Sequence, residues 1–156
     1  MSNAWGYLER SGVPSESCYP YTSGISGNSG LCTAGTCADG STWRVYTAVR
    51  SSTKKFSGIT AIQTEIMTNG PVSAVMQVYQ DFQQHYQSGV YTRQYGAFVG
   101  GHAVKIIGWG TDPQAGGYWI CANSWGTNWG SLGGYFWIKY GQCGIESDVY
   151  AGLAVV

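Results

Sequence analysis

Apolar and polar positions alternate in two stretches of the chain, and this alternation predicts half-buried strands. In residues 72–78 every second position is apolar, with polar or smaller residues between. Residues 43–50 follow the same pattern less strictly, and the aromatic run 135–140 indicates another strand. The chain is therefore expected to consist mainly of β-structure.

A helical spacing precedes the strand at residues 72–78. Thr60 and Gln63 match a capping box, in which two side chains bond backbone N–H groups at the start of a helix. Asn69-Gly70, followed by Pro71, ends this helix. Its predicted apolar face consists of Ile59, Ile62 and Ile66.

The first forty residues have a different character. Residues 4–10 are compatible with an amphipathic helix, and Ser11-Gly12 ends it. Residues 21–42 are rich in Gly, Ser and Thr and predict a loop.

A helical turn and a strand entry are expected within residues 79–91. His85 lies there among glutamines and is expected to be exposed and not catalytic.

Two further strand-like runs carry the residues of greatest chemical interest. His102 stands at the start of the first run, and Asn123 directly follows the second. Turn residues at 111–117 predict a hairpin between them, which can bring the two side chains together. A histidine acts as a general base when a partner holds one ring nitrogen and the other faces the reacting group. Asn123 can accept the ring N–H without adding charge, and Trp125 would cover the pair.

Composition and charge exclude several classes of function. The 156 residues have a net charge of +0 and only 10% charged side chains, so the chain has no electrostatic footprint for nucleic acid or an anionic membrane. No apolar run approaches the length of a membrane span, and residues 1–4 have neither a basic leader nor an apolar core. The many Gly, Tyr and Trp residues alone would suggest a β-sandwich or barrel, which leaves a carbohydrate-binding sandwich as one alternative.

The cysteines do not have the spacing of a metal site. There are five, at positions 18, 32, 37, 121 and 143, and neither histidine is near one in sequence. We therefore expect no metal and no cofactor. Cys121 lies within a predicted strand, where it is expected to be a buried free thiol.

Several blocks, in the same order along nearly the whole chain, resemble the C-terminal part of a papain-family cysteine protease of the cathepsin B branch. Near the two polar residues these blocks are Gly100-Gly101-His102-Ala103, Asn123-Ser124-Trp125-Gly126 and Trp129-Gly130. The others are Ala4-Trp5-x-Tyr7-Leu8, Cys18-Tyr19-Pro20-Tyr21 and Cys143-Gly144-Ile145-Glu146-Ser147.

This resemblance implies an α+β, papain-like fold. Residues 43–156 would form the right-hand antiparallel β-barrel domain, and residues 1–42 the remainder of the helical left-hand domain with a region like the occluding loop. It also implies a disulfide between Cys18 and Cys37, with Cys32 left without its partner.

The same resemblance implies a cysteine endopeptidase in which His102 and Asn123 are catalytic, Trp125 supports them, and no metal takes part. The family signature Cys-Gly-Ser/Ala-Cys-Trp/Tyr, which carries the nucleophile, does not occur in these residues. The nucleophilic cysteine is therefore expected to come from a missing N-terminal segment or a light chain. The alternative is a non-catalytic homologue, or a truncated fragment, that binds peptides.

Substrate contacts are implied at Gly101, Ala103 and Asp148. Asp148 occupies the position of the acidic residue at the floor of the S2 pocket in the cathepsin B branch; a solvated surface carboxylate is the competing interpretation. No histidine lies among residues 1–84, so the carboxydipeptidase activity of that branch is not supported. The expected partner is a peptide or protein, with no nucleic acid and no membrane, in a lysosomal or vacuolar compartment or outside the cell.

Overall fold

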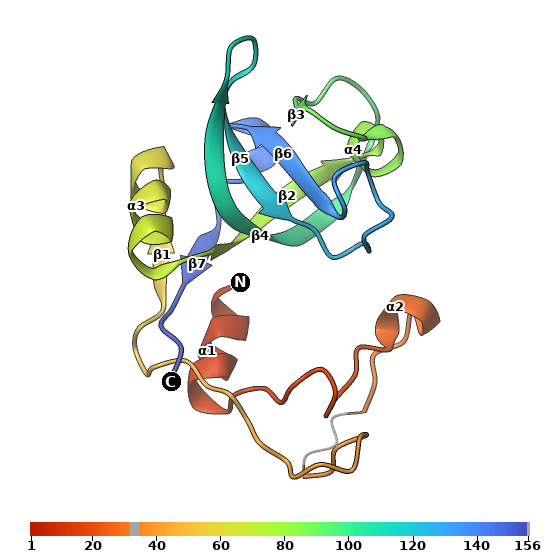
Figure 1. Cartoon of the computed structure of the whole chain (residues 1–156), viewed down its shortest axis with the longest axis vertical. Coiled ribbons are helices and arrows are strands. Elements are labelled where there is room, and N and C mark those ends of the chain that lie inside the picture. The colour runs from red at the N-terminus through yellow and green to blue at the C-terminus, as the bar shows by residue number, and fades with distance from the viewer. Residues whose placement is uncertain (32–34, 156) are drawn as a thin grey trace. The chain divides into compact units, whose positions relative to one another are not determined.

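The computed structural model describes residues 1–31 and 35–155, and the chain in it forms two compact units (Figure 1). The larger unit consists of Met1–Ser2 and Lys54–Ala151. The smaller unit consists of Asn3–Thr53 and Gly152–Val156. The assignment of left-hand and right-hand domains on either side of residue 42 stays a prediction.

A seven-stranded sheet organises the larger unit, in the order β1-β7-β2-β4-β5-β6-β3. Neighbouring strands are antiparallel, apart from the parallel pair β3 and β6. The short end strands β1 and β3 do not pair with each other, so the sheet is open and mixed where a closed antiparallel barrel was expected. The strands are β1 (Lys54–Phe56), β2 (Val72–Tyr79), β3 (Val90–Tyr91), β4 (Phe98–Asp112), β5 (Gly116–Ala122), β6 (Tyr135–Lys139) and β7 (Val149–Ala151).

The core lies on one face of this sheet. Strand β2 confirms the predicted alternation, because its residues 72, 74, 76 and 78 are all buried. Burying a Val or Met side chain contributes roughly 1.5–3 kcal/mol, so a one-residue slip of β2, which would expose Val72, Met76 and Val78, would cost several kcal/mol. The largest fully buried side chains are Trp119, Phe82 and Phe136.

Helix α3 (Ile59–Asn69) confirms the predicted helix but not its capping box. The helix begins two residues earlier than that motif requires, with Gly58 at the N-cap and no side-chain cap. The predicted apolar face is also only partly buried: Ile62 is fully buried, whereas Ile59 is 37% exposed. Gly70 follows the helix with a φ of 108°, a conformation open to glycine, and so ends it as predicted.

Four short helical segments complete the description of both units. The first helix, α1 (Ser2–Arg10), confirms the helix expected near the N-terminus. The predicted turn and strand entry are α4 (Gln80–His85) and β3. The two remaining segments are α2 (Ser23–Ser26), inside the expected loop, and the 3-10 helix η1 (Gln142–Gly144).

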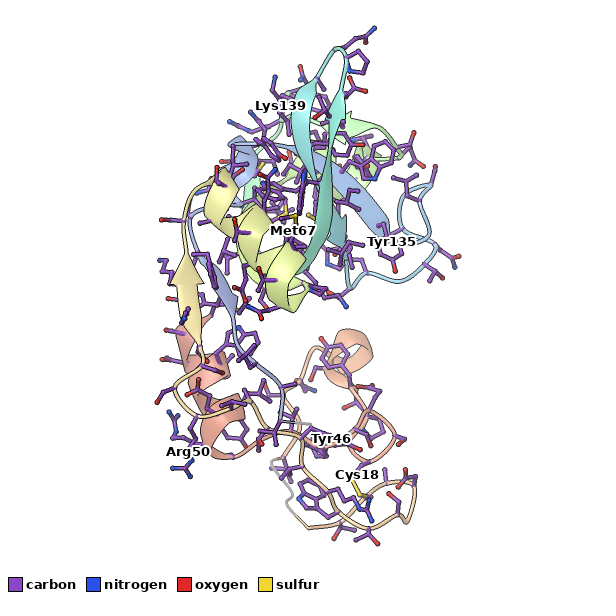
Figure 2. All side chains as sticks on the ribbon, turned by 60° about the vertical axis from the view of Figure 1, so that its left-hand side comes forward. Cys18, Tyr46, Arg50, Met67, Tyr135 and Lys139 are labelled. Carbon is purple, nitrogen blue, oxygen red and sulfur yellow. A yellow bond between two sulfur atoms is a disulfide. The ribbon has the colours of Figure 1, made fainter. Side chains whose placement is uncertain are left out.

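The predicted strand at residues 43–50 is wrong. This stretch forms only two isolated bridges, one between Val13 and Tyr46 and one between Ala48 and Ala154. The two bridges use different partner segments, so no continuous ladder forms. Tyr46, labelled in Figure 2, is accordingly 61% exposed.

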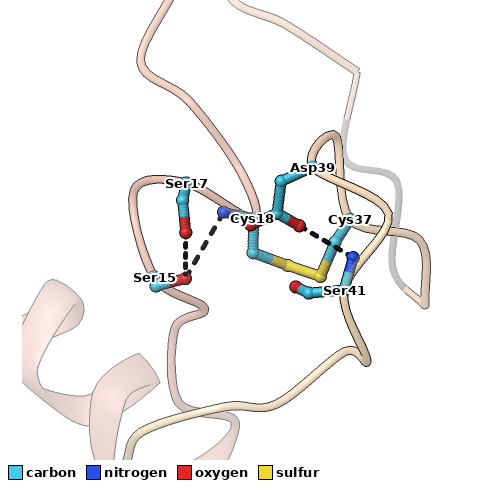
Figure 3. The surroundings of a disulfide bond; sticks show 6 residues. All are labelled: Ser15, Ser17, Cys18, Cys37, Asp39 and Ser41. Atoms are coloured by element: carbon cyan, nitrogen blue, oxygen red, sulfur yellow. Dashed lines mark hydrogen bonds between the residues drawn. A yellow bond between two sulfur atoms is a disulfide. The ribbon is translucent and has the colours of Figure 1, made fainter.

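A disulfide joins Cys18 and Cys37 in the smaller unit, as expected from the family resemblance (Figure 3). Ser15 accepts a hydrogen bond from the N–H of Cys18 at 3.3 Å. Asp39 accepts one from the N–H of Ser41 at 2.9 Å, which orders the turn after the second cysteine. The prediction that Cys32 has no partner lies outside the described residues.

Candidate functional site

His102 lies within strand β4, not at the start of a strand as the sequence pattern indicated. Strand β2 pairs with β4 from Phe98 onward, and His102 is opposite Met76. Val104 and Ile106, the next residues on the same face, are buried, whereas His102 is half-buried. The imidazole therefore stands where the buried face of β4 meets solvent.

The hairpin of β4 and β5 brings Asn123 to His102. Ala122, the last residue of β5, pairs with Lys105, and the N–H of Asn123 donates to the carbonyl of Gly134 at 2.9 Å. The Oδ1 atom of Asn123 then lies 2.8 Å from Nε2 of His102. The structure thus places together the two side chains that the sequence singled out.

A second hydrogen bond fixes which way the Asn123 amide faces. The N–H of Ser124 donates to Oδ1 of Asn123 at 2.8 Å. Rotating the amide by half a turn would set its NH₂ group against this N–H donor, so the oxygen must face His102. Nε2 of His102 therefore carries a proton, and Nδ1 is the ring nitrogen left for a reacting group.

Trp125 stacks on the imidazole. The two ring centroids are 4.6 Å apart and the planes differ by 29°. Trp125 itself packs against Phe82 at 5.8 Å and Trp129 at 5.0 Å, which joins it to the aromatic core. The stack shields the hydrogen bond between His102 and Asn123 and limits rotation of the ring.

The nitrogen of the Asn123 amide was not anticipated from the sequence. Nδ2 is buried and, within the described part of the chain, has no hydrogen-bond partner. A buried donor without a partner costs roughly 1–3 kcal/mol. No sequence signal could have identified it, because the partner of a side-chain amide depends on segments that meet only in the folded chain.

Of the three predicted substrate-contact residues, Gly101 and Ala103 lie on β4, and Asp148 directly precedes β7, which β2 separates from β4. A Cβ built on Gly101 would meet no atom within 4 Å, so the backbone before His102 is open. Ala103 pairs with Val75, whose N–H donates to the carbonyl of Asp148 at 3.1 Å. Directly opposed residues share a sheet face, so Ala103 and Asp148 lie on one face, two strand spacings or roughly 10 Å apart.

The Asp148 carboxylate is paired within the larger unit. Its Oδ1 atom lies 3.1 Å from Nζ of Lys55, and its Oδ2 atom lies 3.6 Å from the α-amino group of Met1. The side chain is 36% exposed.

The free thiols that the structure describes are poorly suited to nucleophilic attack. Cys121 is fully buried, as predicted, and burial raises the pKa of its thiol well above the ordinary value. Burial also raises the pKa of Cys143, to about 11. Since the thiolate is the nucleophile, both are protonated and unreactive near neutral pH.

Other classes of site find no support in the described residues. His85 is exposed, as predicted. No three His, Cys, Asp or Glu side chains of residues 1–31 and 35–155 gather to hold a metal ion. In the same residues, every helix is too short or too polar to cross a membrane.

Comparison with known proteins identifies the family. The model of the papain family cysteine proteases matches residues 1–153. Cathepsin B-like CP2 of Giardia intestinalis is 41% identical over 156 residues, covering 98% of this chain and 51% of that protein. A gut-specific cysteine proteinase of Caenorhabditis elegans is 46% identical over 143 residues, covering 80% of this chain and 42% of that protein.

The fold agrees with this result. The structure of procathepsin B S9 from Trypanosoma congolense is 36% identical, with a TM-score of 0.85, over 98% of this chain and 52% of that one. The predicted papain-like α+β fold is thereby confirmed. The chain spans about half the length of the curated relatives it matches. The chain belongs to the papain family of cysteine proteases, with similarity to its cathepsin B-like members.

Proposed function

We propose that this chain supplies the histidine and the asparagine of a cathepsin B-like cysteine endopeptidase. The nucleophilic cysteine comes from a segment outside these 156 residues. The observation that carries the proposal is the bond from Nε2 of His102 to Oδ1 of Asn123, at 2.8 Å, with the Trp125 ring stacked on the imidazole. This arrangement leaves Nδ1 of His102 for the incoming thiol.

The chemistry follows from that arrangement. A cysteine beside Nδ1 transfers its proton to the ring, and the resulting imidazolium stabilises the thiolate. The thiolate attacks the carbonyl carbon of a peptide bond, and His102 returns the proton to the leaving amine. Water then attacks the thioester, gives its proton to His102, and releases the carboxylic acid as the thiol reforms. Asn123 holds the ring throughout and stays neutral.

Other properties of the complete protein are part of the same proposal. Residues 1–84 hold no histidine to grip a substrate's C-terminal carboxylate, so cleavage is internal. Gly101, Ala103 and Asp148 contact the substrate, and Asp148 favours a basic side chain two residues before the cut. The partners are a peptide or protein substrate and the missing segment or light chain. The compartment is lysosomal, vacuolar or extracellular.

A non-catalytic, peptide-binding protein is the second candidate, and the absence of the nucleophile signature from these residues favours it. The two candidates differ in the gene that encodes the chain. An upstream glutamine followed by Cys-Gly-Ser-Cys-Trp supports the peptidase. A coding sequence without it supports the binding protein.

The polypeptide of 156 residues is expected to have no peptidase activity alone, because its described free thiols are protonated and buried or half-buried. The measurement is hydrolysis of a fluorogenic dipeptide amide under reducing conditions. The complete gene product serves as the positive control. Thiol-dependent turnover that is lost in His102→Ala, by a chain verified by mass, would contradict this expectation.

Asn123→Ala in the complete enzyme is expected to lower kcat/KM roughly a hundredfold, because a misplaced catalytic group has an effect of that order. Asn123 holds the imidazole without touching the substrate, so KM should change little. Asn123→Asp, which keeps the acceptor oxygen, should recover part of kcat. Equal losses in both variants would show that the hydrogen bond to His102 does not position the ring.

A further inference from the structure

Asp148 forms an ion pair with Lys55, and the proposed function assigns no role to this lysine. Nζ of Lys55 lies 3.1 Å from Oδ1 of Asp148. Asp148 is the residue proposed to receive a basic substrate side chain, and here Lys55 already pairs with its Oδ1 atom, while the α-amino group of Met1 lies 3.6 Å from Oδ2.

Strand pairing keeps Lys55 in this position. Strand β1 pairs with β7, and Lys55 is opposite Tyr150, two residues after Asp148. The ammonium group also lies 5.8 Å from the centre of the Tyr150 ring. The hydrogen bond to Asp148 raises the pKa of Lys55, so the lysine is charged at any pH where the enzyme would work.

The pair is accessible. The side chain of Lys55 is 51% exposed and that of Asp148 is 36% exposed. A partly exposed pair has little net strength, so an incoming cation can replace Lys55. Val75 lies beside Asp148, and Ala103 lies one strand further along the same face of the sheet; both offer apolar surface to a substrate side chain.

We propose that Lys55 is a specificity residue which competes with a basic substrate side chain for Asp148. The proposal rests on the proposed function, because it takes Asp148 as part of the pocket for the residue two before the cut. An arginine entering the pocket must displace the ammonium of Lys55, whereas an apolar side chain leaves the pair intact. The complete enzyme therefore accepts apolar residues at this position better than it would if Asp148 lacked Lys55.

The test compares two fluorogenic substrates, Phe-Arg and Arg-Arg dipeptide amides, on the complete enzyme. In Lys55→Gln the ratio of kcat/KM for Arg-Arg to that for Phe-Arg is expected to rise about fivefold, the scale of one partly exposed charge pair. Adding Asp148→Asn to Lys55→Gln should abolish the gain. High salt should reduce it, because salt screens the exposed charges.

Lys54→Gln is the matched control. Lys54 precedes Lys55 on β1, is exposed, and makes no ion pair in the described part of the chain. An equal rise in Lys54→Gln would attribute the effect to net charge and overturn the proposal. So would an unchanged ratio in Lys55→Gln, or a gain that persists with Asp148→Asn.

Failure of the proposed function gives a different result. In that case the wild-type protein shows no thiol-dependent turnover of either substrate, and the role of Lys55 fails with it. If the wild-type enzyme hydrolyses the substrates, the ratio of kcat/KM for Arg-Arg to that for Phe-Arg in each variant tests whether Lys55 competes for Asp148.

Discussion

His102→Ala is expected to reduce kcat/KM of the complete enzyme about a thousandfold or more, because it removes both the partner of the thiolate and the acid that protonates the leaving amine. The loss should appear in kcat for every substrate. His102 is half-buried at the end of the buried face of β4, so the folded state should persist. The measurement is steady-state hydrolysis with thermal unfolding recorded in parallel.

His85→Ala is the matched control for this substitution. His85 is exposed, and its ring lies 6.1 Å from that of Tyr95, outside the group formed by His102, Asn123 and Trp125. Activity should remain near that of the wild type.

A second readout separates catalysis from structure. Without the imidazolium, alkylation of the active cysteine should follow an ordinary thiol pKa of about 8.5. Wild-type alkylation should begin at lower pH. Retention of more than a tenth of the wild-type rate in His102→Ala, or an unchanged alkylation profile, would refute the role of His102.

The site was predictable to the extent that local sequence determines strand pairing. Turn residues between two strand-like runs were sufficient to predict the hairpin, and its register brings Asn123 to His102. The orientation of the amide was not predictable, since it depends on the N–H of Ser124. The pairing of Asp148 with Lys55 was also missed, because nothing local links strands β1 and β7.

The wrong predictions of secondary structure have a similar cause. The alternation at residues 43–50 meets the local requirements of a strand, but no single segment lies alongside it to complete a ladder. The capping box at Thr60 fails because the helix begins at Ile59, after Gly58. Local patterns indicate what a segment can form, and tertiary partners decide what it does form.

The one buried charged side chain among the described residues, Asp81, holds the loop after β3. It is 5% exposed. Its Oδ1 atom accepts hydrogen bonds from the hydroxyl of Tyr91 at 2.8 Å and the N–H of Phe82 at 2.9 Å. Its Oδ2 atom accepts from the N–H groups of Gln94 at 2.9 Å and Tyr95 at 3.3 Å. One carboxylate thus satisfies four donors from two segments.

The pKa of Asp81 is lowered by this arrangement. Burial alone would raise the pKa, but the hydrogen bonds from Gln94, Tyr91, Tyr95 and Phe82 together outweigh it. A carboxyl group with a lowered pKa in the folded state adds stability above its unfolded pKa, near 3.8. That contribution is lost as the pH falls through the folded value.

Asp81→Ala is therefore expected to lower the free energy of unfolding by about 3 kcal/mol near neutral pH, because it leaves buried donors without a partner. For a chain of this length the melting temperature should fall by roughly 10 °C.

The control is Asp112→Ala. Asp112 accepts hydrogen bonds from the N–H groups of Gln114 and Ala115 in the hairpin turn, where water can replace its carboxylate, so the loss of stability should be much smaller. Thermal unfolding is measured from pH 7 down to pH 2, and the difference between wild type and Asp81→Ala should stay constant down to about pH 4 and narrow below the unfolded pKa near 3.8. A difference that is constant with pH, or a loss no larger than that of Asp112→Ala, would show that the Asp81 carboxylate does not stabilise the loop through its charge.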